Sequence, residues 1–278
     1  MLFRSLRSSV LILKSEGEME IAAWELACHA LVMLAEGSPE KAMADCYEAK
    51  EILKDHPWPR GELETSLFLG QALVCLGKDE AAFLELDKAI GIAERLGDLY
   101  SISWATFFEA LSFELHGDHK MAGIAAENSK SSALLSGNMN MVAMVDSFLV
   151  HINFSIGNLE GVESIFNEII ELVREPNLRI RSPLWGMVEL ARSTYLHLAG
   201  EIEASDTSFR KGIELLVGVQ FSALYQGLGM VWYADSLIER GDLVKAKEVL
   251  RRAINLLESI SNKSASTRLE RRIAEIMA

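Results

Sequence analysis

The chain has 278 residues, half of them hydrophobic and only five of them proline, which is the composition of a folded protein and not of a disordered one. Its formal net charge of −13 makes direct binding of nucleic acid unfavourable. The sequence has no run of about eighteen apolar residues, so no membrane partner is expected. Three cysteines without CxxC spacing, Cys28, Cys46 and Cys75, favour buried thiols in a reducing, cytoplasmic compartment over a disulfide.

Residues 1–16 are the first predicted element, a single helix. Leu6, Ser9 and Leu13 stand one 40-residue period before the apolar and small positions of a later helix, so the segment is predicted to be a half-repeat or an N-terminal cap. The partner helix of such a half-repeat would precede Met1. An upstream domain of the same polypeptide is therefore one expected partner.

An internal repeat follows over residues 18–260, and six glycines define it. Successive members are 40, 40, 40, 43 and 41 residues apart, and they are Gly37, Gly77, Gly117, Gly157, Gly200 and Gly241. The residues seven before, five after and twelve after each glycine are mostly small, which lets two helices approach closely. Each unit is predicted to be a helix, a tight turn, a second helix and a second turn.

The turns have a chemistry of their own. A glycine at the end of a helix adopts the left-handed conformation without strain. Asp118, Asn158 and Asp242 directly follow three of the repeat glycines, so they are expected to cap the next helix. A second set of glycines is predicted to close the other helices: Gly17, Gly97 and Gly137.

The stretch ELHGDHKMA, residues 114–122, places two histidines beside an aspartate and a glutamate. His116 and His119 flank the repeat glycine Gly117, and the equivalent positions of other repeats hold residues such as Leu76 and Ile156. A zinc site needs further ligands that no pattern supplies. Both histidines are therefore predicted to be surface residues of a turn, with no metal and no cofactor.

The last predicted element is a helix over residues 264–278. It carries Arg268, Arg271 and Arg272, and a polar face is what the terminal helix of a solenoid needs. Residues 1–278 are thus expected to form one solenoid domain.

The repeat resembles the tetratricopeptide repeat (TPR), and Ala30, Gly37, Ala42 and Ala49 carry the match in its first copy. The period of about 40 residues exceeds the family's 34. Repeats of this length are similar to the helical-repeat regions of MalT-like transcription activators and related signalling regulators. The resemblance implies an all-α solenoid, a right-handed superhelix of about six antiparallel helix pairs.

In such a superhelix the first helix of each pair lines the concave face. By the resemblance, its ligand-facing positions lie thirteen, ten, six and three residues before the glycine. The candidate site residues are Gln71, Trp104, Phe107, Glu114, Met144, His151, Phe154, Met187, His197 and Asp235. Two interpretations stay open, a groove for an apolar or amphipathic peptide and a tightly curled, packed core.

The expected function is a non-catalytic protein–protein interaction module, either a scaffold or the regulatory arm of a signalling or transcription-regulatory protein, with a protein or peptide partner. The alternative is a small-molecule sensor whose concave groove binds a metabolite and controls an upstream effector. An enzyme is disfavoured, because no arrangement of acid, base and nucleophile can be assigned from the sequence.

Overall fold

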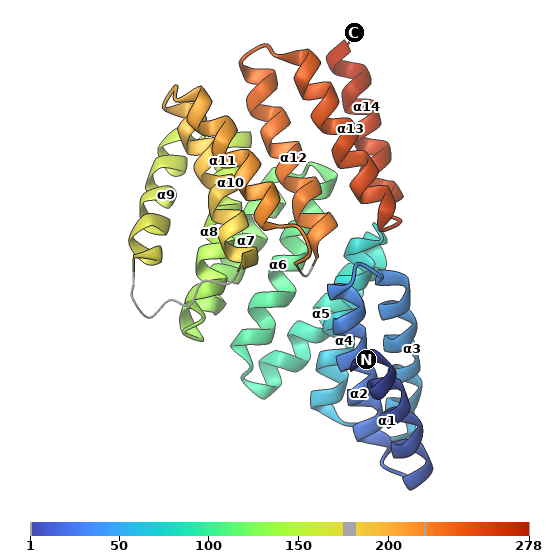
Figure 1. Ribbon diagram of the computed structural model, residues 1–278. Coiled ribbons are helices and arrows are strands. Elements are labelled where there is room, and N and C mark those ends of the chain that lie inside the picture. The colour runs from blue at the N-terminus through green and yellow to red at the C-terminus, as the bar shows by residue number, and fades with distance from the viewer. Residues whose placement is uncertain (1, 175–181, 220, 278) are drawn as a thin grey trace.

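A computed structural model describes residues 2–174, 182–219 and 221–277, and over these residues the chain is helical with no strand (Figure 1). None of the described helices has the length and hydropathy of a membrane-spanning segment. The helices are α1 (Leu2–Glu16), α2 (Met19–Ala35), α3 (Pro39–Asp55), α4 (Pro59–Cys75), α5 (Asp79–Leu96), α6 (Leu99–His116), α7 (His119–Leu135), α8 (Met139–Ser155), α9 (Leu159–Val173), α10 (Ser182–Leu198), α11 (Ile202–Leu215), α12 (Ser222–Glu239), α13 (Leu243–Ser259) and α14 (Lys263–Met277).

Helices α2 to α13 pack in consecutive pairs, and each pair packs on the next. The prediction of an all-α solenoid is confirmed. Close approach within a pair depends on the small residues of the repeat. A Cβ atom added to Gly70 on α4 would lie 2.6 Å from Leu86 Cδ2 on α5, too close for any side chain to fit there without displacing Leu86.

The turn after α6 shows how the repeat sequence ends one helix and begins the next. Gly117 has a φ of 79°, and its N–H donates to the carbonyl of Glu114 at 2.9 Å. The N–H of Asp118 donates to the carbonyl of Phe113 at 3.0 Å, which completes a Schellman motif. The Asp118 carboxylate then accepts the N–H of Met121 at 3.1 Å. The same capping bond at Asn158 and Asp242 confirms the predicted caps.

The first helix, α1, packs on α2 with Val10 fully buried between them. Its exposed side is tied to α3, because the Lys14 ammonium lies 2.7 Å from one carboxylate oxygen of Glu48 and the Arg7 guanidinium 2.8 Å from the other. Such half-exposed ion pairs contribute little to stability, so the apolar contact is what holds the helix.

The superhelix curls far enough for its last helix to touch its second and third repeats (Figure 1). Asn262, just before α14, donates to the carbonyl of Val74 at the end of α4 at 3.2 Å. Ser264 Oγ lies 3.1 Å from His116 Nε2, and the Arg268 guanidinium donates to the carbonyl of Glu114 at 3.0 Å. Contacts across nearly 190 residues of sequence therefore close the solenoid on itself.

This closure changes the role predicted for α14. Of its three arginines only Arg271 is exposed. Arg268 faces α6, and Arg272 forms an ion pair with Asp235 of α12. Two of the arginines thus contact neighbouring helices, because α14 packs between the last repeat and the third.

Candidate functional site

Helix α12 fills the concave face of the third and fourth repeats. The indole of Trp232, 2% exposed, stacks on the ring of His151 with 3.9 Å between centroids and 11° between planes. It meets Phe148 edge-on at 5.8 Å. Its Nε1 donates to a carboxylate oxygen of Glu114 at 3.1 Å. A ligand has no access to the concave face at this point, because the chain itself occupies it.

The ten predicted site residues consequently lie in two environments. Seven are buried, at 8% exposure or less: Gln71, Phe107, Glu114, Met144, His151, Met187 and His197. Three are half-buried: Trp104, Phe154 and Asp235. Phe107, Met144 and Met187 belong to the continuous apolar core, and Trp104 and Phe154 pack against it. Two of the ten, Gln71 and Trp104, line a cleft that is open to solvent.

The two buried histidines of the set have partners that fix their roles. His151 Nδ1 lies 2.8 Å from Thr194 Oγ1, and burial lowers the pKa of His151 to about 3, so its ring is neutral. His197 Nε2 lies 2.7 Å from a carboxylate oxygen of Glu239. Both are structural histidines in this packing.

The two turn histidines are also paired, which the sequence did not indicate. His119 Nδ1 lies 2.7 Å from Glu114 Oε2, and His116 Nε2 lies 3.1 Å from Asp79 Oδ2. These hydrogen bonds to carboxylates raise the pKa of both imidazoles. Within the described residues no group of three metal-binding side chains surrounds either one.

The solvent-accessible cleft lies between the first helices of repeats one to three, α2, α4 and α6. Its volume is about 280 Å³. Aromatic side chains dominate its lining: Trp24, Phe68, Tyr100, Trp104 and Phe221. Trp24 is 39% exposed and Tyr100 is 52% exposed, so these two rings stand at the mouth. Exposed aromatic rings beside a cavity are the commonest anchors of protein interfaces.

Charged side chains at the mouth of the cleft pair with one another. Arg60 Nε donates to Glu64 Oε1 at 2.8 Å, and the same guanidinium pairs with Asp98. Trp24 Nε1 donates to the other oxygen of Glu64 at 2.7 Å. Both oxygens of Glu64 are thus engaged, and the indole of Trp24 is held in place by its own hydrogen bond.

Two polar atoms in the cleft lining have no hydrogen-bond partner among the described residues. One is the acceptor Gln71 Oε1, on a side chain that is only 3% exposed, and the other is the donor Trp104 Nε1. A buried polar atom without a partner costs about 1–3 kcal/mol. The described residues include twelve such atoms, and these two, one acceptor and one donor, belong to side chains that line one solvent-open cleft.

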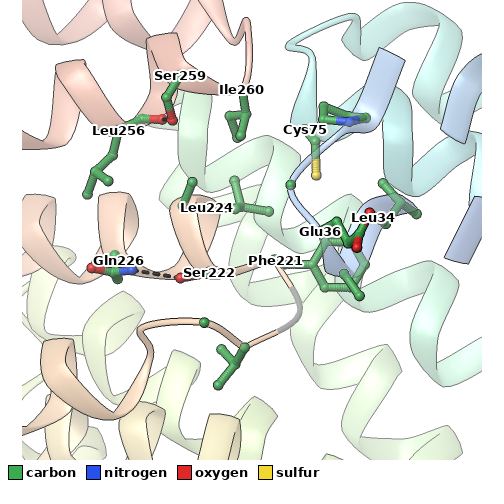
Figure 2. Close-up of a pocket in the computed structure, with 16 residues that line it drawn as sticks. Leu34, Glu36, Cys75, Phe221, Ser222, Leu224, Gln226, Leu256, Ser259 and Ile260 are labelled. Atoms are coloured by element: carbon green, nitrogen blue, oxygen red, sulfur yellow. Dashed lines mark hydrogen bonds between the residues drawn. The ribbon is translucent and has the colours of Figure 1, made fainter. Parts of the chain in front are cut away.

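Phe221, just before α12, separates this cleft from a second cavity of about 290 Å³ (Figure 2). Its backbone is left-handed, with a φ of 58°, which is strained for a side chain of this size. Its ring meets Phe108 at 4.9 Å. The second cavity lies between the ends of α2 and α4 and helices α12 and α13, and its side chains are mostly apolar, such as Leu224 and Ile260.

Several cleft residues were missed by the sequence interpretation, although a signal existed for some. Trp24 and Glu64 stand thirteen residues before their repeat glycines, which is the rule that found Trp104. Arg60 and Tyr100 lie one helical turn earlier, outside the rule. Phe221 had no signal, since the repeat predicts a short turn where a longer segment projects this ring toward the second repeat.

Comparison with known proteins shows the fold alone. No protein-family model matches the chain, and no curated protein does. Among solved structures, a Rap protein complexed with competence and sporulation factor is similar, with a TM-score of 0.62 at 12% sequence identity. The alignment covers 99% of this chain and 84% of that one. The chain therefore has a TPR-like helical-repeat fold, as its glycine period predicted.

Proposed function

We propose that this chain is a non-catalytic recognition module that binds an extended peptide segment of a protein partner in the cleft between α2, α4 and α6. The observation that carries the proposal is the cleft itself, with exposed Trp24 and Tyr100 at its mouth and partly unpaired polar atoms in its lining. Anchors of this kind account for most of the binding energy of many protein interfaces.

The size of the cleft favours a peptide over an enclosed metabolite. Its 280 Å³ lies at the lower limit of cavities that enclose a whole small molecule, which span about 300–1,000 Å³. The space suits one or two anchor side chains of a longer ligand whose backbone stays at the mouth. The similar Rap structure is itself a complex, with competence and sporulation factor, which supports a partner-binding role for this fold.

The absence of catalysis is part of the proposal and rests on how the ionisable groups are used. His151 is neutral and stacked, whereas His119 and His197 are each paired with a carboxylate. The proposal extends to a regulatory role, in which the module is the arm of a signalling regulator, as are the repeats of the MalT-like proteins that it resembles. In this chain, peptide binding would then control an upstream domain.

Selection of peptides from a random display library against the purified chain tests this function. We expect enriched sequences with apolar or aromatic anchors, and we expect their binding to be lost when Tyr100→Ala removes a ring at the mouth. A metabolite panel measured by thermal shift is the second arm, since any ligand of the native state raises the melting temperature. Failure to enrich any peptide, together with a specific metabolite shift, would replace the peptide function by the sensor alternative.

A further inference from the structure

We infer that the cleft recognises a carboxamide, the side chain of a glutamine or asparagine in the bound peptide, through Gln71 Oε1 and Trp104 Nε1. The inference rests on the proposed function and specifies which chemical group that site selects. It derives from the two unpaired atoms, which are of opposite hydrogen-bonding type and belong to side chains that line the same cavity.

Gln71 is a polar residue in an apolar place. It lies on α4 one turn after Leu67 and Phe68, which line the same cleft, and the side chain is almost completely buried. Its oxygen accepts no hydrogen bond from any described residue. A leucine or methionine here would avoid the cost of burying an unpaired amide, so a glutamine at this position needs a partner from outside the chain.

Trp104 supplies the complementary atom from the neighbouring helix α6. Its ring packs near Tyr100 and Phe108, each with 6.4 Å between ring centroids. Its N–H is buried and has no acceptor among the described residues. The other indole of this cleft, that of Trp24, is bonded to Glu64, so the unpaired N–H is particular to Trp104.

A carboxamide is a common side-chain group that matches three features of the lining: the two unpaired polar atoms, the paired charges at the mouth and the aromatic rings. It carries a donor for Gln71 Oε1 and an acceptor for Trp104 Nε1. It is uncharged, so it leaves the ion pair between Arg60 and Glu64 at the mouth undisturbed. Its flat face packs on aromatic rings such as Phe68.

The charged alternatives fit less well. A carboxylate has acceptors only, so it would place negative charge against the oxygen of Gln71 and beside Glu64. An ammonium has donors only, so it would face the N–H of Trp104 and leave that group unpaired. An apolar side chain would bury both polar atoms without any partner. The expected order of ligand side chains is therefore carboxamide first, with the other three behind it.

The test uses a peptide enriched by display and resynthesised with glutamine, asparagine, glutamate, lysine, leucine or serine at its anchor position. Fluorescence anisotropy then gives the dissociation constant of each peptide for the full chain. We expect the glutamine or asparagine peptide to bind on the order of 10-fold more tightly than the leucine and glutamate peptides. In Gln71→Met and Trp104→Phe, that preference should fall toward unity while the affinity for the leucine peptide changes little.

The melting temperature of the free variants separates recognition from packing. Neither substitution removes a hydrogen bond within the described chain, so Gln71→Met should leave the melting temperature unchanged or raise it, and Trp104→Phe should lower it only by the packing that the smaller ring loses. A large fall in melting temperature, with equal loss of affinity for all six peptides, would assign Gln71 a packing role and overturn the inference.

The other outcomes are equally decisive. If enriched peptides bind in a Tyr100-dependent way but prefer leucine, lysine or glutamate, the peptide function stands and the carboxamide inference is wrong. A preference for serine would overturn the inference in the same way, since it would assign the two polar atoms to a hydroxyl or an intervening water. If no peptide is enriched, both the function and the inference fail together.

Discussion

The contact of Trp232 with Glu114 and His151 joins the sixth repeat to the third and fourth, and it yields the sharpest prediction on stability. We consider Trp232→Phe, which keeps an aromatic ring over His151 but removes the N–H that Glu114 accepts. The matched control is Trp185→Phe on α10, the same chemical change at an exposed indole. Any difference between the two variants reports the buried contact and not the loss of a tryptophan as such.

The magnitude follows from what is left behind. In Trp232→Phe a buried carboxylate oxygen of Glu114 loses a donor 3.1 Å away, which costs about 1–3 kcal/mol. The smaller ring also leaves a void in a fully packed region, which adds roughly 1 kcal/mol. We expect a loss of about 2–4 kcal/mol for Trp232→Phe and less than about 0.5 kcal/mol for Trp185→Phe.

Thermal unfolding followed by circular dichroism measures the total effect, and hydrogen exchange locates it. For a chain of this size, 1 kcal/mol corresponds to roughly 2–4 °C, so the melting temperature of Trp232→Phe should fall by several degrees. Exchange should accelerate in α6, α8 and α12, the helices that Trp232 joins, and stay near wild type in α2 and α3. Equal shifts for both tryptophan variants, or uniform acceleration along the chain, would refute the closing role of Trp232.

Two further predictions concern the same closure. Gly77 and Gly157 both have positive φ, but of these two only Gly77 has a neighbour that an added Cβ would meet, Asn262 Oδ1 at 2.5 Å. Gly77→Ala should therefore lower the melting temperature more than Gly157→Ala. Equal losses in the two variants would contradict the contact between Gly77 and Asn262. The pKa of His119 is raised above 6.5 chiefly by its hydrogen bond to Glu114 and also by nearby negative charge. The stabilisation from protonated His119 is therefore complete below about pH 6.5 and is lost as the pH rises through the pKa of the folded protein. Between about pH 6 and pH 8 the wild type should lose more stability than His119→Gln, and parallel stability profiles of the two proteins would contradict this role of His119.

The repeat was predictable because each of its signals is local. Glycine at the helix end and aspartate or asparagine after it act within a few residues, so Gly117, Asp118 and Asn158 behave as the sequence indicated. Close helix packing at Gly70 is local in the same sense, since its neighbour Leu86 belongs to the same repeat.

The contact between the sixth and the third repeats was not predictable, because it depends on a small rotation per repeat summed over four repeats. That sum decides whether Trp232 meets Glu114, which lies 118 residues earlier, or stays in solvent. It also divides the concave face. Phe107 and His151, selected by the same register as Trp104, became core, while Trp104 stayed in an open cleft.

The affinity of a display-selected peptide for three proteins tests the central claim most directly. Wild type, Tyr100→Ala and Tyr47→Ala are titrated against the labelled peptide by fluorescence anisotropy. Tyr100 is 52% exposed at the cleft, and Tyr47 is 47% exposed on α3, outside the cleft lining, so the two substitutions are matched in chemistry and exposure. Peptide binding in the cleft predicts that Tyr100→Ala weakens the affinity on the order of 10-fold or more while Tyr47→Ala leaves it unchanged. Equal affinity for Tyr100→Ala and wild type would contradict the account.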